Sequence, residues 1–126
     1  MGSAYIDTSY LIAIALEEKG FPTLARRLNS FDVVLSSNLL EAEYSAAFAR
    51  RRREPDRTNL GRIEWIHPDR SLRSEITRVL TEGFVRGADC WHLACALFAA
   101  PDPSTISFLT LDTRQQTVAN ALGFAK

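Results

Sequence analysis

Short apolar runs alternate with longer helical segments along the chain, and this alternation constrains the fold more than any other feature of the sequence. The runs expected to be strands cover residues 3–7, 32–36, 63–67 and 107–111. They are rich in aliphatic and β-branched residues, as buried strands are. Strands that alternate with helices form parallel sheets through right-handed crossovers. We therefore predict an α/β protein, a three-layer α/β/α sandwich around a short central parallel sheet.

The segments that follow these runs carry helical signals. Apolar spacing, helix propensity and flanking turn residues predict helices over residues 8–16, 24–31, 37–53, 71–84, 88–99 and 113–122. The helix over residues 88–99 is apolar on nearly every side, so we expect it to lie in the centre of the molecule. Gly123 follows the last helix and is suited to end it.

Length and charge narrow the possible functions. The chain has 126 residues, of which 46% are hydrophobic, enough for a single domain over residues 1–126 to bury a core without disulfides. The 15 Lys and Arg residues balance the 15 Asp and Glu residues. This balance excludes a strongly basic nucleic-acid binder but not a local basic patch. The N-terminal segment has no charged leader and no membrane-spanning stretch, so we expect a soluble, cytoplasmic protein without a membrane partner.

The two cysteines are not arranged for redox chemistry or for zinc. Cys90 and Cys95 stand five residues apart in one predicted helix, so they point to different faces. We expect both to be buried free thiols.

Two aspartates follow predicted strands. Asp7 comes after the first apolar run and Asp112 after the last. In parallel α/β proteins the ligand crevice lies at the carboxyl ends of the strands, which is where both residues would be. The alternative interpretation is that each Asp caps the helix that follows it.

Two further acids stand on predicted helices among apolar neighbours. The positions three and four residues from Glu43 are Leu39, Leu40, Ala46 and Ala47. A carboxylate on such a face needs a partner or a cation, whereas Glu41 has polar neighbours and is expected to be solvated. Asp89 begins a stripe that continues through His92, Leu93, Ala96 and Leu97. Its alternative role is a first-turn acid that complements the helix dipole.

The four acids are most informative when they are taken together. If the helices cover the sheet in the usual way, their carboxylates converge on one crevice. Mutual repulsion would then keep them from all ionising unless a cation is bound. Oxygen ligands without a Cys or His cluster favour Mg²⁺ or Mn²⁺.

Four segments around these acids resemble, in order and spacing, the motifs of PIN-domain nucleases, and most closely those of the short VapC-type toxins of bacterial toxin–antitoxin pairs. The segments are YIDTS at residues 5–9, SNLLEAE at 37–43, GADCWHLA at 87–94 and LTLDTR at 109–114. The likeness covers nearly the whole chain. One departure is the segment between Arg53 and Ile63, which is shorter and more polar than the helix that many relatives carry there.

The resemblance implies roles for the acids and for hydroxyl groups beside them. Asp7, Glu43, Asp89 and Asp112 would be the catalytic, metal-binding acids, with the hydroxyls of Thr8, Ser9 and Thr110 in support. The family's fourth acidic position is its least constant one, and here it falls on Asp112.

The resemblance also implies a function. The protein would be a single PIN domain and a Mg²⁺- or Mn²⁺-dependent endoribonuclease that hydrolyses single-stranded or loop RNA. It would be the toxin of a VapBC-type pair, with a VapB-like antitoxin and a second copy of itself as partners. A bound metal ion suits phosphodiester cleavage because it activates water and neutralises charge on the attacked phosphate.

A run of arginines is the candidate RNA-binding surface. It comprises Arg50, Arg51, Arg52, Arg53 and Arg57. Arginine forms paired hydrogen bonds with phosphate and stacks on bases. The alternative is a solvated helix end whose positive charges complement the helix dipole.

Histidines and tryptophans receive structural interpretations. His92 stands three residues after Asp89 and could orient it, but a buried histidine held by a hydrogen bond is the favoured interpretation. His67 does not stand near it in sequence, so a zinc site is not indicated. Trp65 and Trp91 are expected to be core or subunit contacts rather than base-stacking platforms.

Other classes of function fit less well. A phospho-receiver domain needs a mid-chain acceptor aspartate and a late strand-end lysine, yet Lys19 is early and Lys126 is terminal. A dinucleotide-binding module needs a glycine-rich first turn, which residues 8–10 do not supply. A solitary PIN ribonuclease of RNA processing and an inactive PIN scaffold remain as alternatives. An antitoxin reading frame beside the gene would separate the toxin from the first, and metal-dependent cleavage would exclude the second.

Overall fold

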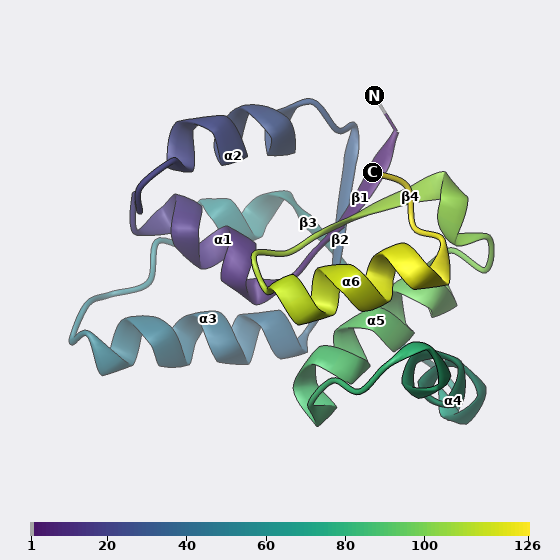
Figure 1. Ribbon diagram of the computed structural model, residues 1–126. Coiled ribbons are helices and arrows are strands. Elements are labelled where there is room, and N and C mark those ends of the chain that lie inside the picture. The colour runs from purple at the N-terminus through teal and green to yellow at the C-terminus, as the bar shows by residue number, and fades with distance from the viewer. Residues whose placement is uncertain (1) are drawn as a thin grey trace.

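A short parallel sheet separates two layers of helices in the computed structural model, which describes residues 2–126 (Figure 1). The strands are β1 (Ser3–Ile6), β2 (Val33–Ser37), β3 (Ile63–Ile66) and β4 (Ile106–Leu109), in the order β3-β2-β1-β4. All neighbours are parallel, and Tyr5 of β1 pairs with Leu35 of β2 on one side and with Phe108 of β4 on the other. The predicted α/β/α sandwich is confirmed. Met1, the first residue of the expected domain, lies outside the described residues.

Among residues 2–126, six α-helices follow or flank the strands, and two of them begin at a side-chain cap. They are α1 (Thr8–Ala15), α2 (Phe21–Asn29), α3 (Leu39–Arg50), α4 (Arg73–Glu82), α5 (Gly87–Ala99) and α6 (Thr113–Leu122), with 3₁₀ turns η1 (Asn59–Arg62) and η2 (Pro103–Thr105). Asp7 caps α1 and Asp112 caps α6 through their side chains. Gly123 ends α6 in the left-handed conformation, at φ 98°. No helix among residues 2–126 is long and apolar enough to span a membrane.

Several element ends differ from the prediction. The helix predicted over residues 37–53 is shorter in the structure, where α3 spans Leu39–Arg50. It begins later because β2 continues to Ser37, and it ends earlier because the chain turns after Arg50, with Arg52 at a φ of 54°. The strand predicted to reach residue 111 ends at Leu109, since the next backbone N–H groups bond to side-chain hydroxyls instead of to a strand. The second helix begins at Phe21, earlier than predicted, because Pro22 is tolerated in a first turn.

Each face of the sheet packs on its own core. Along β1, Tyr5 belongs to the core under α4, α5 and α6, while Ala4 and Ile6 belong to the core under α1 and α3. This alternation is the two-residue period of a strand. On α5 the residues His92 through Leu97 are all buried, which confirms its predicted central position.

The two cysteines lie in the same core. Cys90 and Cys95 are both buried free thiols, as predicted. Burial raises the pKa of both groups, that of Cys95 to about 12, so they remain protonated at neutral pH.

Candidate active site

The four predicted acids lie where the carboxyl edge of the sheet meets the beginnings of three helices. Asp7 directly follows β1, Asp112 precedes α6 and Asp89 is in the first turn of α5. Glu43 projects from α3. Figure 1 shows the beginnings of α1 and α6 side by side, and Thr110 contacts Asp7 across them.

The pKa of Asp89 reflects its closeness to the other three acids. Its pKa is raised, first by burial of the carboxyl group and then by the negative charges of Asp7, Asp112 and Glu43. His92 acts in the opposite direction. The structure therefore brings all four acids within electrostatic reach of one another.

Asp7 is held by hydroxyl groups from two different elements. Its carboxylate, 4% exposed, accepts a hydrogen bond from Ser9 Oγ at 2.7 Å. Thr110 Oγ1 lies 3.0 Å from the same carboxylate oxygen and 2.8 Å from Gln115 Oε1. These contacts orient the Asp7 carboxylate from two sides.

Glu43 has a protein partner rather than an apolar surrounding. Its Oε1 accepts hydrogen bonds from Thr8 Oγ1 at 2.7 Å and from the buried His92 Nε2 at 2.8 Å. These bonds, that of His92 above all, lower the pKa of Glu43. The expected need for a partner is confirmed, and the partner is an imidazole and a hydroxyl.

The prediction that Glu43 stands on the apolar stripe of its helix was wrong. The buried stripe of α3 is Leu40, Tyr44 and Phe48, whereas Ala46 is exposed. Glu43 stands at the edge of this face, which is where a charged group reaches both a buried histidine and solvent. Glu41 is exposed, as predicted.

A chain of hydrogen bonds fixes His92. The backbone N–H of Ser37 donates to Tyr5 Oη at 3.1 Å, so the phenol O–H is available to donate to His92 Nδ1, 2.6 Å away. The proton on Nε2 then faces Glu43. In this arrangement Nδ1 accepts from Tyr5 and Nε2 donates to Glu43, so both ring nitrogens have a hydrogen-bond partner. The expectation of a buried, hydrogen-bonded histidine is confirmed, but it lies inside the acid site.

Sequence reasoning did not single out Tyr5 or Gln115. Gln115 is fully buried, contacts Thr110 and donates to the backbone carbonyl of Asp89, while its own N–H is capped by Asp112. A Gln in the first turn of a helix behind an Asp cap is a weak signal, because capping by itself explains the pair.

A cavity of about 600 Å³ opens beside Asp89 and Asp112. Its other lining residues are Phe84, Arg86 and Arg114. Arg86 immediately precedes α5 and Arg114 is in the first turn of α6, where a positive charge works against the helix dipole. This unfavourable placement is the sequence signal that could have identified the two arginines as candidate site residues.

The predicted arginine run lies elsewhere. Arg50 to Arg53 and Arg57 are exposed around the carboxyl end of α3, which Figure 1 shows far from the beginnings of α5 and α6. Arg50 stands seven residues beyond Glu43, about 10 Å along the helix. Arg51 donates to the carbonyl of Ala47, and the Arg53 guanidinium lies 5.6 Å from the centre of the Phe48 ring. The structure therefore does not bring this run to the acids.

The tryptophans and His67 lie outside the acid site. Trp65 and Trp91 are partly buried and pack against the two cores, in agreement with the expectation. His67 is exposed just after β3.

The donor chemistry of the site fits a hard divalent cation, although the side chains are arranged around protein partners. Within residues 2–126, no three Asp, Glu, His or Cys side chains lie close enough to hold a metal ion as they stand. Asp7 and Glu43 are occupied by hydroxyls and by His92. The pKa of Asp89 is raised first by burial and then by the neighbouring acids, whose negative charges a divalent cation would neutralise. Carboxylate oxygens are the ligands that Mg²⁺ and Mn²⁺ prefer.

Comparison with known proteins identifies one family. A family model described as PIN domain matches residues 4–121, a span that contains all four acids. No curated protein and no solved structure matches the chain significantly.

Proposed function

The chain belongs to the PIN-domain family, and on that premise we propose that it is a metal-dependent endoribonuclease that hydrolyses RNA phosphodiester bonds. The observation that carries the proposal is the placement of Asp7, Glu43, Asp89 and Asp112. They come from four separate elements, yet three of them raise the pKa of the fourth.

In this proposal the four acids hold Mg²⁺ or Mn²⁺. Such an ion, when bound, activates water and neutralises charge on the attacked phosphate. Ser9 and Thr110 orient Asp7, and Thr8 and His92 orient Glu43. Partners of this kind keep ligands in one orientation and raise metal affinity.

The arginines have separate proposed roles. Arg86 and Arg114 line the same cavity as Asp89 and Asp112 and are placed to contact substrate phosphates there. The run from Arg50 to Arg53, with Arg57, would contact RNA farther from the acids. Replacing Arg51 and Arg52 by Glu should then weaken RNA binding more than metal binding, and unchanged RNA affinity would remove that role.

The direct test is cleavage of a labelled single-stranded RNA by the purified protein. Cleavage should require Mg²⁺ or Mn²⁺ and stop in EDTA. Asp7→Asn and Asp89→Asn should each lower the rate by more than roughly 100-fold. Replacing a residue that only hydrogen-bonds to a metal ligand already lowers metal affinity or activity by about 10–100-fold. Glu41→Gln changes an exposed acid of α3 that is not a predicted ligand, so it is the matched control and should retain full activity. Cleavage that survives EDTA would exclude the metal mechanism.

A finer proposal is that the enzyme is the toxin of a VapBC-type pair. Its support is the resemblance of the four acidic segments to VapC-type toxins. In this proposal the single domain over residues 1–126 acts in the cytoplasm as a homodimer, and a VapB-like antitoxin binds it. Expression alone should arrest growth, Asp89→Asn should not, and co-expression of the product of an adjacent small reading frame should restore growth. A metal-dependent nuclease that is harmless when expressed would instead be a solitary PIN ribonuclease.

A further inference from the structure

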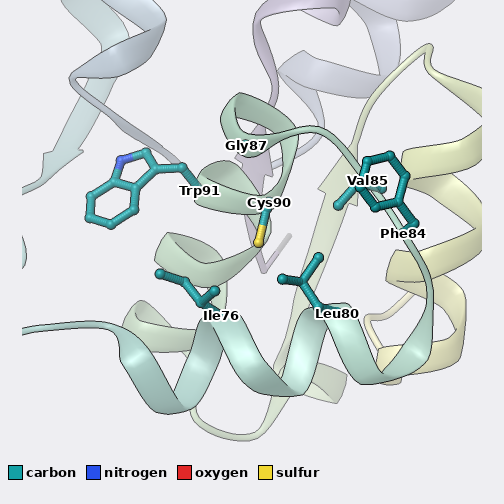
Figure 2. Close-up of a pocket in the computed structure, with 7 residues that line it drawn as sticks. All are labelled: Ile76, Leu80, Phe84, Val85, Gly87, Cys90 and Trp91. Carbon is teal, nitrogen blue, oxygen red and sulfur yellow. The ribbon is translucent and has the colours of Figure 1, made fainter.

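Phe84 is the most exposed large apolar side chain among residues 2–126, at 69%. It stands in the segment that joins α4 to α5. Figure 2 shows Ile76, Leu80 and Cys90 facing one another between these helices, with Phe84 beside Val85 at the end of this groove. Because this exposed ring lies at the mouth of an apolar groove, it is placed to contact a ligand or a partner.

The exposure of Phe84 does not come from a loosely attached segment. On one side, Gly83 lies so close to α6 that a Cβ built there would be 3.1 Å from Val118 Cγ2. On the other side, the Val85 side chain is 3% exposed and packs in the core. The ring is therefore presented outward between two anchored neighbours.

Phe84 borders three cavities, and two of them differ in character. It lines the apolar groove of about 450 Å³ between α4 and α5. It also lines the charged cavity that holds Asp89, Asp112, Arg86 and Arg114. An aromatic ring that shares a cavity with two exposed arginines suits a nucleotide, whose base stacks on aromatic rings and whose phosphates pair with arginine.

We propose that Phe84 stacks an unpaired base of single-stranded RNA while Arg86 and Arg114 contact the phosphates beside that base. This inference rests on the proposed function and names residues that would hold its single-stranded substrate. Bases in a duplex remain stacked on each other and are not available to the ring. The enzyme would accordingly prefer single strands and loops, because they alone supply a base that lies on Phe84 next to the acids.

The test measures RNA binding separately from cleavage. Fluorescence anisotropy in EDTA gives the Kd of a short single-stranded RNA for the parent protein and for Phe84→Ala. The variant should bind about tenfold more weakly, the usual effect of losing one stacked base. Phe84→Trp should restore binding because it restores the aromatic surface. With 2-aminopurine in the RNA, the quenching that a stacked base gives in the parent should be lost in Phe84→Ala.

Matched variants separate stacking from charge and from protein contacts. Leu80→Ala removes the other exposed apolar side chain of the groove, which does not line the charged cavity, and should leave the Kd unchanged. Arg86→Gln and Arg114→Gln should each lower the slope of log Kd against log salt by about 0.7, whereas Phe84→Ala should leave that slope unchanged.

Two results would overturn the inference. One is equal RNA affinity and equal quenching for the parent and Phe84→Ala. The other is a change of oligomeric state in both Phe84→Ala and Leu80→Ala with RNA binding unaltered, which would assign the ring to a protein contact. Stacking without any metal-dependent cleavage would leave this inference standing and remove the proposed nuclease, so the two failures are distinguishable.

Discussion

Hydrogen bonds from hydroxyl groups and from an imidazole hold two of the carboxylates of the site. Asp7 is held by Ser9 and Thr110, and Glu43 is held by Thr8 and His92. Asp89 differs from them because burial and the neighbouring acids raise its pKa, against the smaller opposing effect of His92. Hydrogen bonds therefore orient Asp7 and Glu43, whereas the environment of Asp89 disfavours its ionised form.

This difference predicts that Asp89→Asn stabilises the metal-free protein. The raised folded-state pKa means that ionised Asp89 costs stability above that pKa, and that the cost disappears as pH falls below the unfolded value. In EDTA at pH 7 the gain should be on the order of 0.5 kcal/mol, the size of a like-charge repulsion near a surface. Thermal unfolding checks it, and the gain should vanish at pH 3.

Two controls accompany this measurement. Glu41→Gln removes an exposed acid and should change the melting temperature little. Added Mg²⁺ should raise the melting temperature of the parent more than that of Asp89→Asn, because an ion that binds only the folded state stabilises it. A lower melting temperature for Asp89→Asn in EDTA would show that the acids do not repel one another.

The hydrogen-bond chain through Tyr5 gives a second prediction at this scale. Tyr5→Phe leaves His92 Nδ1 and the Ser37 N–H buried without their partner. Urea unfolding should show a loss of about 1–3 kcal/mol, the cost of unsatisfied buried groups. Tyr10→Phe, which removes a part-buried bond to the Leu24 carbonyl, should cost less. Equal losses of stability in Tyr5→Phe and Tyr10→Phe would contradict this chain of hydrogen bonds.

At the scale of elements, the beginnings and ends of strands and helices determine where the functional side chains stand. Beyond β4, the Leu111 N–H donates to Ser9 Oγ and the Asp112 N–H donates to Thr110 Oγ1. These bonds replace the pairing of a strand and turn the chain into α6. The same two hydroxyls contact Asp7, so the end of one element and the orientation of an acid depend on one set of bonds.

The first turn of α4 supplies a pH-dependent prediction. Arg70 Nη2 lies 2.6 Å from Glu75 Oε2, and this guanidinium lowers the pKa of Glu75 to about 2. A lowered folded-state pKa gives stability that is complete above the ordinary carboxyl pKa and is lost as pH falls through about 2. Because the pair is near the surface, Glu75→Gln should cost at most about 1 kcal/mol at pH 7.

The measurement is urea unfolding of parent and Glu75→Gln from pH 7 to pH 2, where the two free energies of unfolding should converge. Glu82→Gln is the control at the other end of α4. It should be neutral or slightly stabilising, because an acid in the last turn opposes the helix dipole. A difference between parent and Glu75→Gln that stays constant over this range would exclude the ion pair as its cause.

At the scale of the whole molecule, two cores share one thin sheet. Ile6 is buried in the core under α1 and α3, and Ile106 is buried in the core under α4, α5 and α6. Their strands are adjacent, but their side chains stand on opposite faces. Substitutions in one core should therefore not affect the packing of the other. The two cores should still unfold together, since neither is complete without the sheet.

This arrangement predicts additive losses in one cooperative transition. Ile6→Val and Ile106→Val should each cost about 0.5–1.5 kcal/mol, and the double variant should lose their sum to within about 0.5 kcal/mol. Circular dichroism and tryptophan fluorescence should give coincident unfolding curves for all three variants. Curves that separate would show that the layers unfold independently.

The sequence by itself indicated the alternation of strands and helices, the central position of α5, and two acids after strands and two on helices, because periodicity, propensity and capping act over a few residues. It also indicated that Glu43 needs a partner. Only the tertiary structure decided that this partner is His92, 49 residues away, and that Tyr5 and Gln115 complete the site. It likewise placed Arg86 and Arg114, not the arginine run, beside the acids. These contacts join residues distant along the chain, and they follow from how layers pack rather than from any local pattern.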